Sequence, residues 1–133
     1  MELQIIDGDF SVCRLDSIEQ VDFSRELLFF AKTPDELSLV CESAHVPVKA
    51  INVESDWKML KVSGTLDFGL VGVVSKISGI LAAAEISIFV VSTFNTDYIL
   101  LKSDSFNKGL KVLSQGGYII IPSINPQQQS SAH

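Results

Sequence analysis

The sequence is poor in the residues that build metal and nucleophilic centres. Its 133 residues include two cysteines and two histidines. Cys13 and Cys41 lie far apart in apolar surroundings, where an isolated cysteine behaves as a small buried hydrophobic residue. There is no CxxC motif or Cys/His cluster, and the histidines, His45 in a loop and His133 at the end, give neither cysteine an evident activating base. The sequence therefore predicts no metal site, no cofactor and no catalysis.

Positive charge and long apolar runs are also scarce. Ten Lys and Arg face sixteen Asp and Glu, for a formal net charge of -6, which disfavours nucleic acid and anionic membranes as partners. The first ten residues lack a basic region followed by an apolar run, so no secretory signal is predicted. Charged residues interrupt the most apolar region, 66–91, which argues against a membrane span. A cytoplasmic protein is expected.

The chain is organised around residues 61–102, which predict a strand, a turn, a helix, a strand, a second turn and a returning strand. The helix is expected over residues 68–84, because apolar residues recur there at three-or-four spacing. Residues 86–91 are continuously apolar and β-branched, typical of a strand covered on both faces. Residues 92–97 supply turn residues, and residues 98–101 form the returning strand.

The flanking segments extend this pattern to the order β-α-β-β-α-β, which is ferredoxin-like. The segments are a strand over 57–63, a second helix over 106–113 capped by 103–105 and ended by 115–117, and a strand over 118–121 stopped by Pro122. Residues 57–122 are therefore expected to form one domain, and residues 123–133 a disordered polar tail.

The first half has strands at similar places but no long amphipathic helix. We expect residues 1–56 to form a degenerate copy of the same unit, with a polar boundary at 52–56. The expected segments are strands at 3–6, 10–15, 27–32 and 37–41, turns at 7–9 and 33–36, a helical turn within 16–22, and a loop with a short helix over 42–50. The fold class is thus α+β, with two ferredoxin-like units packed as one compact unit.

Four segments resemble a known family. They are FSVCRL at 10–15, DELSLVC at 35–41, LDFGLVGV at 66–73 and, longest, ISIFVVSTFNTDYIL at 86–100. Together they resemble the ACT domain, a small ligand-binding ferredoxin-like module. More closely, they resemble the tandem-ACT proteins related to the cytosolic arginine sensor for mTORC1 and their small bacterial relatives.

The resemblance implies a ligand held where the turn before the helix meets the strand-turn beside it. Asp97 aligns with the acidic residue that binds the cationic end of the ligand in the arginine sensor. Asn95, where relatives often have an acidic residue, and Glu85, where glycine usually ends the helix, depart from the pattern. The residues of the implied ligand site are Asp67, Phe68, Gly69, Leu70, Val71, Gly72, Val91, Ser92, Thr93, Phe94, Asn95 and Asp97.

The chemistry of these residues suits an α-amino acid. A helix N-terminus attracts a carboxylate, Gly69 and Gly72 allow close approach, and Asp97 offers a negative charge for an ammonium group. Each feature also has a plainer explanation. Asp67 is a favoured helix cap, the glycines permit close packing, and residues 92–97 can be a hairpin turn whose side chains bond their own backbone.

The function expected is therefore a non-enzymatic regulatory sensor of a free amino acid. A homodimer is expected, because ACT units commonly associate and short strands leave open edges, and an unidentified protein partner is possible. One alternative is an interaction or structural module without a ligand. Another is a small enzyme that uses an acidic pair such as Asp7 and Asp9, or Asp35 and Glu36, although acidic residues in turns are usually solvated.

Overall fold

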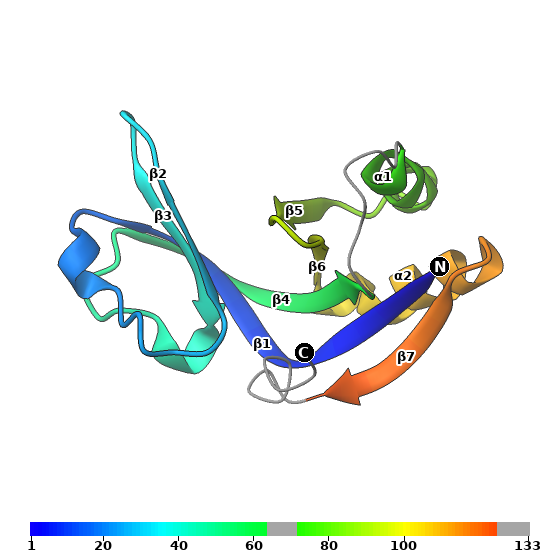
Figure 1. Cartoon of the computed structure of the whole chain (residues 1–133), viewed down its shortest axis with the longest axis horizontal. Helices are drawn as coiled ribbons and strands as arrows, with labels where there is room; N and C mark the ends of the chain where they lie inside the picture. The colour runs from blue at the N-terminus through cyan, green and yellow to red at the C-terminus, as the bar shows by residue number, and fades with distance from the viewer. Residues whose placement is uncertain (64–71, 125–133) are drawn as a thin grey trace. The chain divides into compact units, whose positions relative to one another are not determined.

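The computed structural model describes residues 1–63 and 72–124 (Figure 1). The elements in chain order are β1 (Glu2–Leu15), η1 (Ile18–Gln20), β2 (Leu28–Lys32), β3 (Leu37–Glu42), η2 (Ser43–His45), β4 (Asn52–Val62), α1 (Val73–Ala83), β5 (Ile88–Ser92), β6 (Asp97–Lys102), α2 (Ser103–Gln115) and β7 (Ile119–Ile124). This mixture confirms the α+β class. No helix among the described residues is both long enough and apolar enough to span a membrane.

The described residues form two compact units. The C-terminal unit consists of Met1–Asp7 and Lys58–Ile124, and the N-terminal unit consists of Gly8–Trp57. The division between Trp57 and Lys58 lies next to the boundary predicted from the sequence. The first seven residues differ from that prediction, because they pair with β7 and so cluster with the C-terminal unit.

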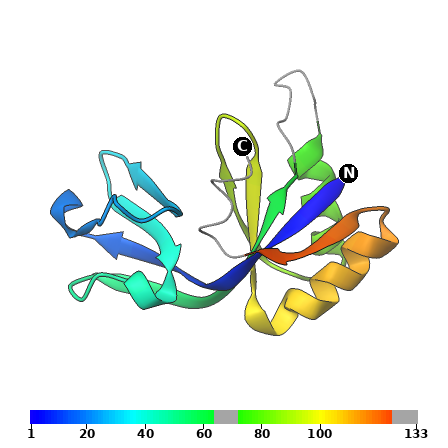
Figure 2. The ribbon, with the colours of Figure 1, turned by 60° about the horizontal axis from the view of Figure 1, so that its bottom comes forward.

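The C-terminal unit has the predicted order β4, α1, β5, β6, α2, β7, with one inserted strand. Its strands are arranged β7-β1-β4-β6-β5. The first residues of β1 pair in parallel with β7, with Leu3 opposite Ile120. In Figure 2, α2 lies along β7. Both helices pack on a core that contains Leu60, Ile77 and Leu113, each 0% exposed.

The predicted start of the first helix is wrong. The helix begins at Val73, and its N-cap is Gly72, with φ of 79°. Glycine adopts this left-handed conformation without the penalty that a Cβ would bring. Residues 68–71, where the helix was expected to begin, lie outside the described residues. The buried stripe is confirmed for Ile77 and Leu81, which face the core.

The second helix and the last strand are longer than predicted. Helix α2 begins at Ser103, with Lys102 as its N-cap, and ends at a C-cap on Gly116. Strand β7 continues past Pro122 to Ile124, so the tail predicted from residue 123 is wrong for its first two residues. Residues 125–133 lie outside the described residues.

The N-terminal unit arranges its strands in the order β2-β3-β1-β4. Its core contains Cys13, Leu15, Val21, Leu39 and Cys41. The strands predicted at 27–32 and 37–41 are confirmed as β2 and β3, which pair as an antiparallel hairpin. The short helical segments η1 and η2 are also confirmed.

Two predicted breaks in this part of the chain are wrong. Strand β1 does not end at residues 7–9, because Gly8, with φ of 119°, lets the strand continue through an irregular backbone conformation. The polar segment 52–56 is not a linker but the beginning of β4. All five of its residues are exposed, which suits their mostly polar composition.

Candidate functional site

The predicted strand-turn is a hairpin between β5 and β6, closed by hydrogen bonds of one threonine. The backbone N–H of Thr93 donates to the carbonyl oxygen of Thr96 at 2.8 Å. The Thr93 hydroxyl donates to the same oxygen at 2.9 Å and accepts from the Thr96 N–H at 3.3 Å. The alternative reading, a turn whose side chains bond their own backbone, is therefore correct for Thr93, which is not available as a free ligand group.

Thr96 attaches this turn to the end of another strand. Its side chain is 4% exposed, and its hydroxyl donates to the carbonyl oxygen of Val62 at 2.7 Å. Val62 is the last residue of β4, the strand that leads toward α1. The sequence-based site omitted Thr96. The Thr-x-x-Thr spacing was the only sequence pattern that pointed to Thr96. The partner of Thr96 in β4 cannot be inferred from the sequence.

Ser92 and Asp97 form the last cross-strand pair of the hairpin. The Ser92 hydroxyl donates to Oδ1 of Asp97. The Asp97 side chain is half-buried, whereas Ser92 is exposed. A serine hydroxyl that bonds one carboxylate oxygen orients the carboxylate and leaves acceptor positions on the group for a ligand.

At the N-terminus of α1, the N-cap residue Gly72 supplies no side-chain cap. Gly72 has no side chain that can accept from the first amides of the helix, and the first intrahelical bond runs from the Lys76 N–H to the Gly72 carbonyl at 2.8 Å. The first amides of a helix lack an intrahelical partner, and amides in this position bind anions at helix N-termini. Asp67, the alternative cap, lies outside the described residues, and the N-cap position is held by Gly72.

The structure brings together only part of the predicted site. Val91, Ser92 and Asp97 lie at the end of the hairpin, with Thr93 in the turn. Phe94 projects from the tip, 80% exposed, and Asn95 is exposed beside it. Five further predicted residues lie outside the described residues: Asp67, Phe68, Gly69, Leu70 and Val71.

The two cysteine thiols are buried and free. Burial raises the pKa of Cys13, and it raises the pKa of Cys41 to about 12, so both thiols stay protonated near neutral pH. Asp35 and Glu36 are exposed in the β2–β3 turn, where their backbone N–H groups donate to Thr33 Oγ1. In the described part of the chain, no three His, Cys, Asp or Glu side chains gather to hold a metal ion.

Comparison with known proteins finds a family match in this part of the chain. A model of the ACT domain matches residues 52–115, which cover β4, α1, β5, β6 and α2. The human cytosolic arginine sensor for mTORC1 subunit 1 is 34% identical over 85 residues, which are 63% of this chain and 23% of the sensor. The match therefore spans about a quarter of the sensor's length.

Solved structures agree with this match. Protein Atu0741 from Agobacterium tumefaciens has a TM-score of 0.82 and 28% identity over 93% of this chain and 94% of its own. The regulatory subunit of aspartate kinase from Thermus thermophilus has a TM-score of 0.60 at 7% identity, over 86% of this chain and 96% of its own, which shows the shared fold alone. The resemblance noted in the sequence is thus confirmed: residues 52–115 match the ACT-domain model, and the chain is similar to the cytosolic arginine sensors for mTORC1.

Proposed function

We propose that this protein is a non-enzymatic regulatory module that binds a free amino acid at the β5–β6 turn of its C-terminal unit. ACT domains are regulatory ligand-binding modules, and the curated relatives are named as arginine sensors. The observation that carries the proposal is the Ser92–Asp97 pair. It places an oriented carboxylate at the hairpin end, which Thr96 holds against the end of β4.

The two charged ends of an amino acid would bind to different elements. Asp97 would accept hydrogen bonds from the ammonium group, and charge-assisted bonds of this kind are roughly twice as strong as neutral ones. The first turn of α1 would bind the carboxylate, because its amides and the helix dipole both favour an anion. The predicted residues 67–71 belong to this proposal as the segment between β4 and α1.

The N-terminal unit is proposed to be a degenerate second ACT-type unit. Its β2–β3 hairpin has the same construction as β5–β6. The Thr33 N–H donates to the Glu36 carbonyl at 3.0 Å, as the Thr93 N–H does to Thr96, and in each hairpin the threonine hydroxyl accepts from the N–H three residues later. A helical segment follows each second strand: the three-residue η2 follows β3, and the 13-residue α2 follows β6.

Ligand binding would act by shifting an assembly. A ligand changes the docking of two surfaces only when its affinity differs between the two arrangements. A homodimer, or a complex with a protein partner in the cytoplasm, is the assembly that we propose. The alternative function is an interaction module without a ligand. It would form the same kind of assembly but would bind no amino acid.

A thermal-shift screen against the twenty amino acids tests the proposal. A ligand at a hundred times its dissociation constant stabilises the native state by about 2.7 kcal/mol, which moves the unfolding midpoint visibly. We expect a shift with one or a few amino acids, lost in Asp97→Ala. Asp35→Ala is the matched control, because it removes the same charge from the turn of the other hairpin, and it should keep the shift. No shift with any amino acid would favour the interaction module.

A further inference from the structure

A cavity lies within the N-terminal unit, away from the residues of the proposed amino-acid site. Its volume is about 200 Å³. It is half-open to solvent and is bordered by η1 and the loop after it, by β2 and β3, and by η2 and the segment that follows. The lining residues are Gln20, Val21, Asp22, Arg25, Leu28, Leu39, Cys41, Ala44, His45, Val46, Pro47 and Val48.

The floor of the cavity is apolar. Val21, Leu39 and Cys41 belong to the buried core of the unit, and Leu28 and Val46 pack against them. Burial raises the pKa of the Cys41 thiol to about 12, so the thiol stays neutral and forms part of the apolar wall. Such a floor favours an aliphatic group over a charged one, because burying apolar surface is favourable and burying an unpaired charge is costly.

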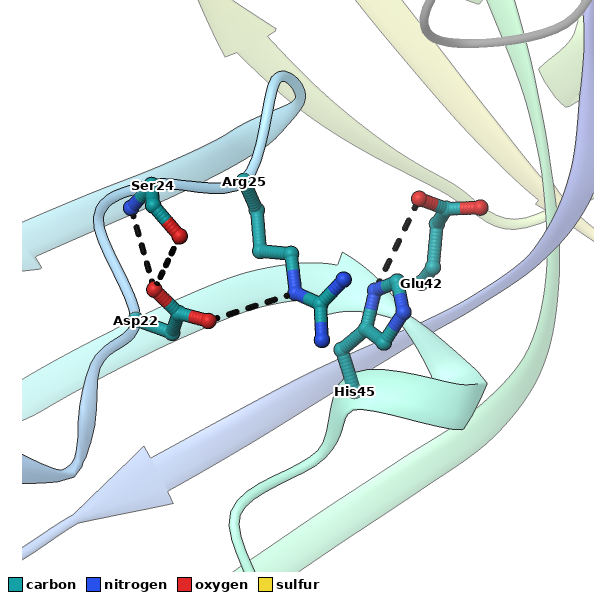
Figure 3. A network of polar contacts seen from close by, with 5 residues as sticks. All are labelled: Asp22, Ser24, Arg25, Glu42 and His45. Carbon is teal, nitrogen blue, oxygen red and sulfur yellow. Dashed lines mark hydrogen bonds and ion pairs between the residues drawn. The ribbon is translucent and has the colours of Figure 1, made fainter.

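The rim carries two basic side chains next to each other. Figure 3 shows the guanidinium of Arg25 between Asp22 and His45, with its terminal nitrogens turned toward the imidazole. Arg25 Nε lies 3.4 Å from Oδ2 of Asp22, and His45 Nδ1 lies 3.7 Å from Oε2 of Glu42. Both distances are longer than a strong charge-assisted hydrogen bond.

Asp22 does not depend on Arg25 for its charge. Its Oδ1 accepts from the Ser24 hydroxyl at 2.6 Å and from the Ser24 N–H at 3.1 Å. These two bonds, ahead of the charge of Arg25, hold the pKa of Asp22 below its usual value. Arg25 therefore remains able to exchange a long contact with Asp22 for a bidentate bond to another carboxylate.

We propose that this cavity binds a small aliphatic carboxylate, with its alkyl group against Leu28, Leu39 and Cys41 and its carboxylate on Arg25 and His45. The volume of about 200 Å³ equals the share of about seven water molecules in the liquid. It therefore fits a short branched acid and is smaller than the cavities of about 300–1,000 Å³ that hold drug-sized ligands. This proposal does not rest on the amino-acid site, which uses other residues in the other unit.

Methyl NMR of the full chain with isovalerate as the probe tests it directly. The methyl groups of Val21, Leu28 and Leu39 line the cavity, and those of Leu60 and Leu100, buried in the C-terminal unit, are internal controls. We expect saturable shifts confined to the first set, with a dissociation constant on the order of 1 mM for so small a ligand. Isoamylamine, which has a similar alkyl group and the opposite charge, should cause no such shifts.

Variants then identify the carboxylate partner. Arg25→Gln should weaken isovalerate binding by about tenfold or more. Arg14→Gln, which removes another exposed positive charge, from β1 of the same unit, should leave it unchanged. Leucine is the second probe, and comparing it with isovalerate shows whether the carboxylate comes from an amino acid or from a simple acid. Binding of either acid supports the proposal. Absence of shifts at the cavity methyls with both acids, or equal binding of isoamylamine by the unaltered protein, would overturn it.

Discussion

The hydroxyl of Thr96 donates a 2.7 Å hydrogen bond to the carbonyl oxygen of Val62, and this bond joins the β5–β6 turn to the end of β4. Thr96 is 4% exposed and Val62 is 0% exposed. The bond therefore lies in a buried setting, where an unmade hydrogen bond is costly. It fixes the position of the turn that presents Asp97, the residue on which the proposed amino-acid site depends.

Replacing Thr96 by valine should reveal the strength of this attachment. Thr96→Val keeps the shape of the side chain but leaves the carbonyl of Val62 without its donor, so the free energy of unfolding should fall by about 1–3 kcal/mol. Urea denaturation measures the change. Thr93→Val is the comparison, because it also removes hydroxyl bonds within the turn but at an exposed residue, and its cost should be below about 1 kcal/mol. An equal cost for both variants would contradict the structural role of the Val62 contact.

The sequence predicted those elements whose ends coincide with a change in polarity. The β2–β3 and β5–β6 hairpins each consist of two apolar runs around a polar turn, and both were recognised. The errors lie where a backbone dihedral angle decides the outcome. Gly8, with φ of 119°, allows β1 to continue through a polar segment. Gly72, with φ of 79°, is the N-cap of α1, although the helical spacing of apolar residues in the sequence begins before it.

The site was predicted less completely than the fold. Ser92 and Asp97 were selected for their chemistry, but their pairing depends on the register between β5 and β6, which the sequence does not specify by itself. Thr96 was missed because its partner, Val62, belongs to a strand distant in sequence. Side-chain contacts between separate elements are tertiary information, and no local pattern encodes them.

Two helix glycines should respond in opposite directions to the same substitution. A Cβ on Gly109, in α2, would lie 2.5 Å from Cδ2 of Leu101, which is 0% exposed. Gly109→Ala should therefore destabilise the protein by about 1–3 kcal/mol through overpacking. Gly79, in α1, has open space around the same position, so Gly79→Ala should stabilise by about 0.5–1 kcal/mol because alanine is the better helix former. Thermal unfolding of the two variants measures the sign of each change in stability. A loss of stability in Gly79→Ala would contradict the open space around Gly79.

Replacing Glu85 by glycine should stabilise the protein. It follows the C-cap of α1 with φ of 60°, a left-handed conformation that costs a residue with a Cβ. Glu85→Gly should raise the free energy of unfolding by about 0.5–1 kcal/mol, since glycine takes this conformation readily. Glu85→Ala is the control, because it removes the same charge and keeps the Cβ, and it should not stabilise the protein. Chemical denaturation of both variants separates the backbone effect from the effect of the charge.

The buried thiol of Cys41 should make the protein less stable in alkaline solution. Its pKa rises from 9.0 to about 12 because burial disfavours the thiolate. The unfolded chain loses this proton from about pH 9 upward while the folded protein keeps it, so stability is complete below pH 9 and is lost as pH rises toward 12. Between pH 8 and pH 10 the loss from this group should be on the order of 1 kcal/mol.

Urea denaturation at the two pH values measures this loss in the unaltered protein and in Cys41→Ala. The variant removes the titrating group, so its stability should fall less between pH 8 and pH 10, whatever its stability at pH 8. Val40→Ala is the matched control, because it shortens a neighbouring side chain of β3 that is 4% exposed and does not titrate. It should lose stability at both pH values and keep the full alkaline decrease. An identical decrease in Cys41→Ala would show that the thiolate forms as easily in the folded protein as in the unfolded chain. The floor of the N-terminal cavity would then not be the apolar wall that binding of an aliphatic group requires.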